Sequence, residues 1–164
     1  MTAARTPIER EIHRLLPHRY PMLLVDRILE LVPGEHIVAV KAVSLNEPWY
    51  AHISDAPEGR DLGYPPALLL ESWGQAAGLL AGAGPTGGMA GEDSVMLFGG
   101  ASAVEYARPV WPGELVTHHV RLGRVFDEAL MVEGEARCGD EVVMTVGQGL
   151  MAFRPAAVLR PTSD

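Results

Sequence analysis

The sequence is poor in the residues that hold secreted and metal-binding proteins together. Its 164 residues include one cysteine, Cys138, so no disulfide can form within the chain, and a reducing cytoplasm is the expected compartment. An HExxH motif, a cysteine pair and a carboxylate cluster are all missing, and we therefore expect no metal site. A GxSxG motif is also missing, which argues against a serine nucleophile.

Long hydrophobic runs are missing too. No stretch approaches the roughly 20 apolar residues that a membrane-spanning helix needs, and the N-terminus has no signal-peptide core, so we expect no membrane partner. Basic residues are in deficit, with 13 Lys and Arg against 21 Asp and Glu and a net charge of −8. This excess of negative charge argues against binding to nucleic acid or to anionic membranes.

The residues that are present suffice for one domain with one core. Thr6, Pro7 and Glu9 predict a helix start, so a short helix is expected within residues 1–16, ended by Pro17. The later elements follow from hydrophobic patterns and turn residues. They are a hairpin of strands 23–31 and 36–44, a polar loop 46–63, a long helix 67–83, a glycine-rich loop 84–93, strands 94–107, 114–126, 129–138 and 141–153, and a loosely held tail 154–164.

The long helix is apolar almost all round and must therefore be buried. Gly74, Gly78 and Gly82 recur on it every four residues. Because glycine in a helix costs about 1 kcal/mol relative to alanine, we expect this face to approach a flat neighbour closely. One curved antiparallel sheet wrapped around one buried helix is the α+β arrangement called the hotdog fold, and we predict it as a single domain over residues 1–164. Its open sheet edges predict pairing with a second subunit.

Two polar residues lie in positions suited to acid–base chemistry. Glu71 sits one turn into the apolar helix, where burial would favour the protonated form that a general acid requires near neutral pH. A glutamate that reaches the surface or pairs with an arginine is the alternative. His52 is a candidate general base, with a structural or solvated histidine as the alternative, as for His18. His118 and His119 are adjacent in a strand, so they face opposite sides of the sheet and cannot easily share a metal.

Five segments of the chain form a set with a definite order. They are the run LLPHRYPMLLVDR from Leu15 to Arg27, Asn46 to Tyr50, Glu71 to Gly78, Phe98 to Gly100, and Arg108 to Leu115. This set resembles the β-hydroxyacyl-acyl carrier protein dehydratases of the FabZ type. The first run matches the N-terminal signature of that family almost letter for letter, and the similarity extends in order from Leu15 to Phe153.

The resemblance implies a hotdog enzyme that converts a β-hydroxyacyl thioester on acyl carrier protein to the trans-2-enoyl thioester, without a cofactor. It implies that His52 removes the α-proton and that Glu71 helps the β-hydroxyl leave as water, the two residues coming from different chains of a dimer. Ala67, Gln75 and Gly100 are the expected substrate-binding residues, with backbone N–H groups at the helix start and near Gly100 holding the thioester carbonyl. The apolar helix face would line a tunnel for the acyl chain.

The expected partners are an acyl carrier protein and a second hotdog subunit, either a copy of this chain or a relative, in a dimer or a higher oligomer. Acyl carrier proteins are acidic as a class, so a docking site for one has to be a local patch of arginines. Arginine makes up 12 of the 13 basic residues. Fatty-acid synthesis and polyketide or polyene assembly both use this reaction, and both pathways stay open.

The chain departs from the family pattern around the two candidate residues. Ala51 replaces a glycine, Ile53-Ser54 replaces phenylalanine-proline, and the acidic stretch before Glu71 is longer. The family commonly has proline-glycine where this chain has Pro65-Pro66, and Pro66 has no N–H to donate. These departures keep two alternatives: a weakly active or inactive hotdog subunit that pairs with a related dehydratase subunit, and, less favoured, an acyl thioesterase.

Overall fold

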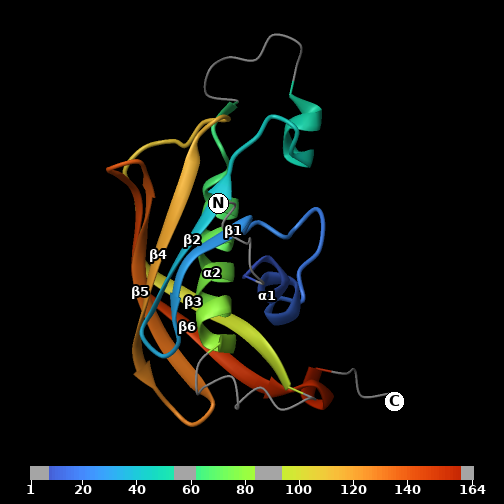
Figure 1. The fold of residues 1–164 in the computed structure, drawn as a ribbon, viewed down its shortest axis with the longest axis vertical. Helices are drawn as coiled ribbons and strands as arrows, with labels where there is room; N and C mark the ends of the chain where they lie inside the picture. The colour runs from blue at the N-terminus through green and yellow to red at the C-terminus, as the bar shows by residue number, and fades with distance from the viewer. Residues whose placement is uncertain (1–7, 54–61, 84–93, 160–164) are drawn as a thin grey trace, which may run out of the picture.

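The computed structural model describes residues 8–53, 62–83 and 94–159. It contains the helices α1 (Ile8–Leu15) and α2 (Pro66–Ala83), the strands β1 (Arg27–Val32), β2 (His36–Ala42), β3 (Ser94–Tyr106), β4 (Leu115–Val125), β5 (Ala129–Cys138) and β6 (Glu141–Pro155), and the 3-10 helices η1 (Pro48–His52) and η4 (Ala156–Leu159). Figure 1 shows α2 lying along one face of a curved sheet, with α1 beside α2 on the side away from β4 and β5. The predicted hotdog arrangement is confirmed.

The sheet has the strand order β1-β2-β4-β5-β6-β3, and each neighbouring pair is antiparallel. Strand β3 is reached only after α2 has crossed the sheet, and it adds to the far edge beside β6 (Figure 1). It is therefore an edge strand of 13 residues whose outer backbone groups have no strand partner among the described residues. No helix in the described part of the chain has the length and apolar character to span a membrane.

The core lies between α2 and the inner face of the sheet. Trp73 and Leu79 of α2 are fully buried, and Ile37, Val116 and Leu130 are equally buried on β2, β4 and β5. Strand side chains alternate between the two faces of a sheet, so each of these strands contributes every second residue to the core. Burial of large apolar side chains on this scale is the main favourable term in folding.

The glycine face of α2 meets side chains from β3 and α1. A Cβ on Gly74 would lie 3.7 Å from the ring of Phe98, and a Cβ on Gly78 would come within 2.8 Å of Cε of Met96 and 3.2 Å of Cδ2 of Leu16. The close approach predicted from the glycine spacing is confirmed, but the neighbours are the edge strand and the end of α1 rather than a flat sheet. These two elements close over one side of the helix.

The largest difference from the predicted elements lies before the first hairpin. Residues 23–26 were expected to open the first strand, but β1 begins at Arg27. At the other end, the expected tail begins with the last residues of β6, which runs to Pro155 and leads into η4. The polar loop 46–63 contains η1. The predicted helix start at Thr6 and the glycine-rich loop 84–93 lie outside the described residues.

Candidate active site

Helix α2 carries Glu71 on a flank that neither the sheet nor α1 covers. Oε1 of Glu71 lies 2.9 Å from Nε2 of Gln75, one turn further along the helix, and 3.4 Å from Nε2 of His18. The side chain is 35% exposed, and Leu68 and Leu70 on the same turn are also partly exposed. The buried carboxylate expected from the sequence is therefore partly exposed in the single chain, because neither the sheet nor α1 covers this flank of α2.

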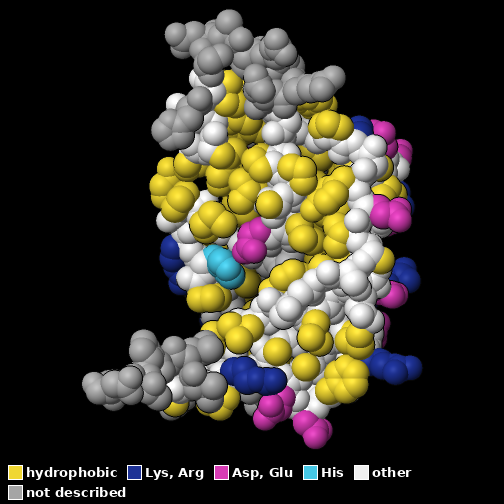
Figure 2. Space-filling view, turned by 180° about the vertical axis from the view of Figure 1, so that it is seen from behind, with side chains coloured by type: hydrophobic (Ala, Val, Ile, Leu, Met, Phe, Trp, Pro, Cys, Tyr) yellow, Lys and Arg dark blue, Asp and Glu magenta, His cyan; other side chains and the backbone are white. Residues whose placement is uncertain are grey.

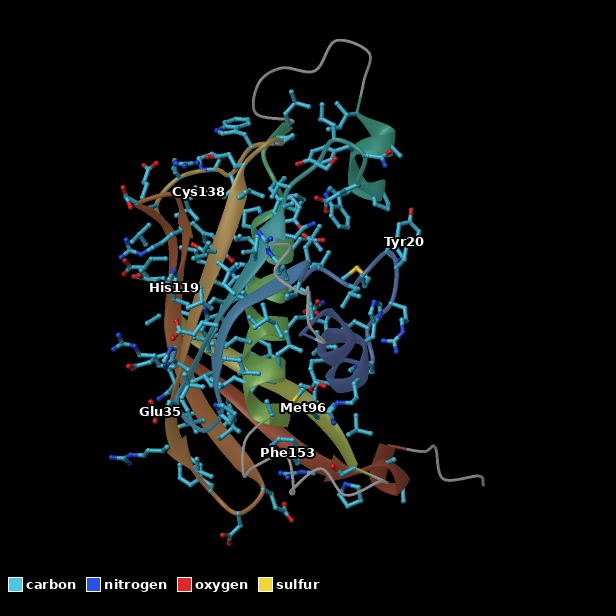
Figure 3. The ribbon with its side chains drawn as sticks, viewed as in Figure 1. Tyr20, Glu35, Met96, His119, Cys138 and Phe153 are labelled. Atoms are coloured by element: carbon cyan, nitrogen blue, oxygen red, sulfur yellow. The ribbon has the colours of Figure 1, made fainter. Side chains whose placement is uncertain are left out.

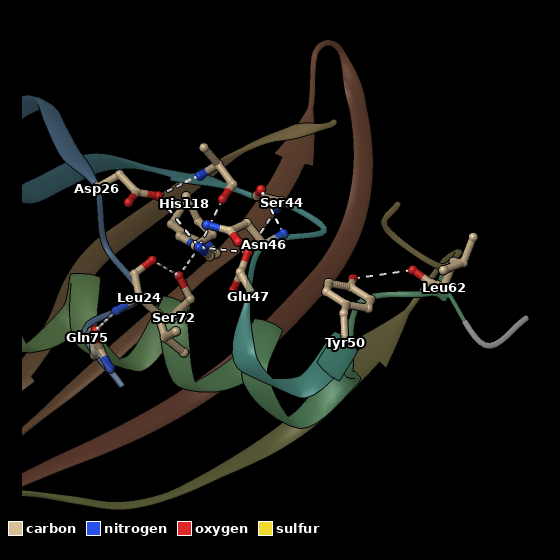
Figure 4. Close-up of polar contacts among 12 residues, drawn as sticks. Leu24, Asp26, Ser44, Asn46, Glu47, Tyr50, Leu62, Ser72, Gln75 and His118 are labelled. Atoms are coloured by element: carbon tan, nitrogen blue, oxygen red, sulfur yellow. Dashed lines mark hydrogen bonds and ion pairs between the residues drawn. The ribbon is translucent and has the colours of Figure 1, made fainter. Parts of the chain in front are cut away.

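The lead-in segment (residues 17–26) is bound to α2 by two helix side chains (Figure 4). Oε1 of Gln75 accepts the N–H of Leu24 at 2.8 Å, and its Nε2 donates to the carbonyl of Met22 at 2.7 Å and to Glu71. The hydroxyl of Ser72 donates to the carbonyl of Leu24 at 3.1 Å. These bonds satisfy backbone groups that a neighbouring strand would otherwise satisfy, which is why β1 starts only after the segment. Gln75, predicted to bind substrate, holds Glu71 and the segment together here.

A fully buried histidine lies behind Ser72. Nε2 of His118, on β4, is 2.8 Å from the Ser72 hydroxyl. Because that hydroxyl donates to Leu24, His118 carries its hydrogen on Nε2, which leaves Nδ1 as a buried acceptor without a partner in the described part of the chain. Burial, helped by the nearby charges of His119 and Lys41, lowers the pKa of His118 to about 3. Figure 3 shows His119 on the face of the sheet away from α2, as predicted for adjacent strand residues.

The buried, neutral His118 makes the folded state sensitive to acid. An unfolded histidine takes up a proton below about pH 6.5, but the folded chain does so only near pH 3, so stability is full above pH 6.5 and is lost as the pH falls towards 3. We expect the wild type to lose about 2 kcal/mol more between pH 7 and pH 5 than His118→Gln, which keeps an N–H for Ser72. Urea denaturation at both pH values measures this difference, with His119→Gln as the control on the outer face. Equal losses in the three proteins would contradict the prediction.

The 3-10 helix η1, which ends at His52, begins after a buried ion pair. Nζ of Lys41 lies 3.1 Å from Oε1 of Glu47 and 3.7 Å from Oδ2 of Asp26. The side chains of Lys41 and Glu47 are 7% and 11% exposed. Oε1 of Glu47 also accepts the N–H of Ser44 at 2.9 Å. The residue that precedes η1 is therefore fixed to the end of β2 by charge and by a hydrogen bond.

Two aromatic residues hold η1 from its other side. Trp49 packs edge to face on Tyr64, with the ring centroids 5.7 Å apart. The hydroxyl of Tyr50 donates to the carbonyl of Leu62 at 3.3 Å (Figure 4). Together with the ion pair, these contacts hold η1, whose last residue is His52, to one side of α2 (Figure 1). The side chain of His52 lies outside the described part of the chain.

The first turn of α2 has one N–H group that no described backbone carbonyl accepts. Pro66 has none, whereas Ala67 is exposed and its N–H has no backbone acceptor among the described residues. The hydroxyl of Tyr106 donates to the carbonyl of Pro66 at 3.0 Å, which ties the end of β3 to this turn. The N–H expected to bind the thioester carbonyl thus lies one position after the proline and is not taken by a described backbone carbonyl.

Gly100 lies on the part of β3 that passes the uncovered flank of α2. Phe98, just before it, packs against Gly74, and Tyr106, further on, reaches Pro66. A β-bulge interrupts the pairing with β6 between Phe98 and Gly100, and Gly100 has a φ of +154°, which favours glycine. Apart from Gly100 and its two chain neighbours, no described residue has an atom within 4 Å of the place that a Cβ would take, so the strand backbone faces open space here.

An apolar rim surrounds this flank. It consists of Met22, whose carbonyl is bound by Gln75, and of Phe98 and Tyr106 on β3, and these three side chains are 37–42% exposed. Figure 2 shows a broad hydrophobic face on which an acidic side chain lies beside a histidine. Large apolar side chains gathered around a carboxylate are typical of a surface that another molecule covers.

His18 is the site residue that the sequence analysis missed. We expected it to be structural or solvated, but its Nε2 lies beside the Glu71 carboxylate. No local pattern reveals this contact, because His18 precedes the first hairpin and Glu71 follows it. The one available signal was its place inside the run that resembles the FabZ signature.

Comparison with known proteins decides the family. The model of the FabA-like domain matches residues 16–147. The chain belongs to the FabA-like family. Within it, a 3-hydroxyacyl-[acyl-carrier-protein] dehydratase FabZ from Paracidovorax citrulli is 42% identical over 133 residues, which cover 80% of this chain and 87% of the relative. A dehydratase of the same name from Nitratidesulfovibrio vulgaris is 39% identical over 141 residues, covering 83% and 87%. This FabA-like chain is therefore of the FabZ type.

Solved structures resemble this FabA-like chain in fold. The dehydratase heterocomplex ApeI:P from Xenorhabdus doucetiae contains a chain with a TM-score of 0.73 at 20% identity, covering 90% of this chain and 93% of that one. The fluoroacetyl-CoA thioesterase FlK gives a TM-score of 0.59 at 15% identity, covering 79% and 93%. At these identities the likeness concerns the fold alone.

Proposed function

We propose that the chain is a hydro-lyase that converts a β-hydroxyacyl thioester on acyl carrier protein to the trans-2-enoyl thioester and water. The observation that carries this proposal is the geometry of Glu71, a carboxylate on an uncovered flank with Oε1 held by Gln75 and His18. Oε2 has no partner among the described residues and can meet a substrate hydroxyl. The FabZ relatives, named as dehydratases of this class, support the same reaction.

In the proposed reaction His52 takes the α-proton, and protonated Glu71 gives its proton to the β-hydroxyl. The electron pair of the Cα–H bond forms the double bond, the Cβ–O bond breaks, and water leaves. His52 is then protonated and Glu71 ionised, and exchange with solvent restores both. The Ala67 N–H, at the positive end of α2, binds the thioester oxygen as negative charge develops on it, and the backbone at Gly100 contributes a second contact. Elimination of water involves no net redox change, and the proposal assigns no cofactor.

We further propose that the working form is a dimer joined along β3. The edge of β3 and the apolar rim around Glu71 lie on the same flank, and both need cover. In such a pair, His52 of one chain serves the Glu71 of the other, as in the family that the sequence resembles.

The acyl carrier protein delivers the substrate. Arg19, on the lead-in segment, and Arg27, at the start of β1, are both exposed and supply positive charge for this acidic partner. Cytoplasmic location stays a prediction.

The proposal is tested by supplying the purified protein with a β-hydroxyacyl thioester on acyl carrier protein and, separately, with the trans-2-enoyl thioester. Mass spectrometry of the carrier should show loss of one water in the first reaction and gain of one water in the second. Release of free acid and free carrier thiol would identify a thioesterase instead. No conversion in either direction, by the chain alone or with a co-expressed relative, would reject the proposed function.

A second candidate function is that of a subunit that pairs with a related dehydratase and supplies one part of a working site. The observation that favours it is Pro66, which removes an N–H from the helix start where the family commonly has a glycine. In that case the chain alone is inert in the assay, and adding the related subunit restores conversion. Activity of the chain alone decides for the first candidate.

A further inference from the structure

The two oxygens of the Glu71 carboxylate have different surroundings. Oε1 accepts a hydrogen bond from Nε2 of Gln75 at 2.9 Å and lies 3.4 Å from Nε2 of His18. The Gln75 amide cannot be turned over, because its own Oε1 accepts the N–H of Leu24 and its other N–H goes to the carbonyl of Met22. An amide N–H can only donate, so Oε1 of Glu71 must be an acceptor. A proton on Oε2, which has no partner among the described residues, leaves this hydrogen bond undisturbed and points away from Gln75.

His18 is held in its position by the residue that follows it. The guanidinium of Arg19 donates to three carbonyl groups, those of His13 at 3.0 Å, Leu16 at 2.8 Å and His18 itself at 2.6 Å. These bonds fix the chain between the end of α1 and the lead-in segment. Nδ1 of His18 is buried and has no partner among the described residues. The ring is thus packed on one side and directs its second nitrogen at Glu71.

We propose that His18 is a positioning residue for the dehydration step, and this rests on the proposed function. Its Nε2 packs against Oε1 at 3.4 Å and, together with the hydrogen bond from Gln75, limits rotation of the carboxyl group about the bond to Cδ. Oε2, which carries the proton, is then the oxygen that faces the β-hydroxyl. The proton passes from Oε2 to the hydroxyl as the Cβ–O bond breaks, while the base takes the α-proton. Without the contact from His18 the carboxyl samples orientations in which the acidic oxygen does not face the substrate.

Two amide substitutions separate this role from packing. The side-chain nitrogen of glutamine takes the place of the histidine Nε2, whereas that of asparagine takes the place of Nδ1 and cannot reach Glu71. We expect His18→Asn and His18→Leu to lower the single-turnover rate about tenfold to a hundredfold, with KM unchanged within about twofold. His18→Gln should keep the rate within about threefold of wild type. The melting temperature of each variant is recorded to separate loss of fold from loss of rate.

A matched control exists elsewhere in the chain. Nε2 of His36 lies 3.4 Å from Oε1 of Glu30, and the His36 side chain is as exposed as that of His18. This pair bridges β1 and β2, outside the site, so His36→Leu should turn over like the wild type.

The outcomes distinguish the two claims. A folded His18→Asn or His18→Leu with a wild-type rate would overturn the role of His18 and leave the proposed function standing. A His18→Gln variant that is as slow as His18→Asn would also overturn it. A wild type that does not dehydrate, alone or with a relative, rejects the proposed function and this proposal with it.

Discussion

Replacing Glu71 by glutamine is expected to lower kcat for dehydration by about 10² to 10⁴ and to leave the melting temperature near that of the wild type. Glutamine keeps the size of the side chain and an oxygen acceptor for Gln75 and His18, but it has no acidic O–H for the leaving hydroxyl. The glutamate is partly exposed in the single chain, so its exchange leaves little buried surface unsatisfied. Single-turnover rates and thermal denaturation of the same samples measure the two effects.

Glu30→Gln is the matched control, since Glu30 also lies beside a histidine but outside the site. A Glu71→Gln protein that works within about tenfold of the control would remove Glu71 from the mechanism.

Mixing Glu71→Gln chains with His52→Ala chains tests whether the site is shared between two chains. If the two residues meet across a dimer, half of the random dimers contain one intact site, and about a quarter of the wild-type activity returns. No recovery after subunit exchange would place both residues in one chain.

Replacing Lys41 by methionine is expected to destabilise the fold by about 3 to 5 kcal/mol. The substitution removes the ammonium group that neutralises Glu47 and leaves that carboxylate almost without water, since its side chain is 11% exposed. Oε2 of Glu47 is already buried without a partner among the described residues. Because Glu47 directly precedes η1, the rate of the folded fraction should fall as well, through displacement of His52. Urea denaturation measures the loss of stability, and turnover below the melting temperature measures the rate of the folded fraction.

A second substitution separates the effect of the buried charge from that of packing. Lys41→Met combined with Glu47→Gln removes both charges and should recover most of the lost stability, because no carboxylate of the pair then stays buried unpaired. Arg154→Met breaks the exposed pair with Glu128 and should cost at most about 1 kcal/mol. If the single and double substitutions at the buried pair cost the same, the loss comes from packing rather than charge.

Much of the fold could be predicted because the information is local. Much of β4, β5 and β6 alternates in burial, and glycine turns such as Gly113 and Gly139 precede or separate these strands, so their positions follow from the sequence within a few residues. The start of β1 could not be predicted in the same way. Leu24 and Val25 are buried as strand residues are, but the bonds to Leu24 come from Ser72 and Gln75, which lie on an element far along the chain.

In the candidate site too, the features set by local sequence could be predicted, and those set by distant contacts could not. Glu71 is recognisable as a polar residue on an apolar helix, but its exposure depends on which flank of α2 is left uncovered, and that is a property of the whole sheet. The role of His18 depends on the contacts of Arg19 with the end of α1. Ala67 and Gly100 were named from the resemblance alone, and their binding roles stay predictions.

The bonds from Ser72 and Gln75 to residues 22–24 also restrict how such a chain can recombine with its relatives. The helix side chains replace a neighbouring strand for this segment, so each piece is fitted to the other although more than forty residues separate them. A recombination crossover between β1 and α2 joins the lead-in segment of one relative to the α2 helix of another, and these two pieces have not evolved together. Crossovers within the later hairpins do not separate this pair. Exchange of sequence among relatives should therefore preserve the two pieces as one inherited unit.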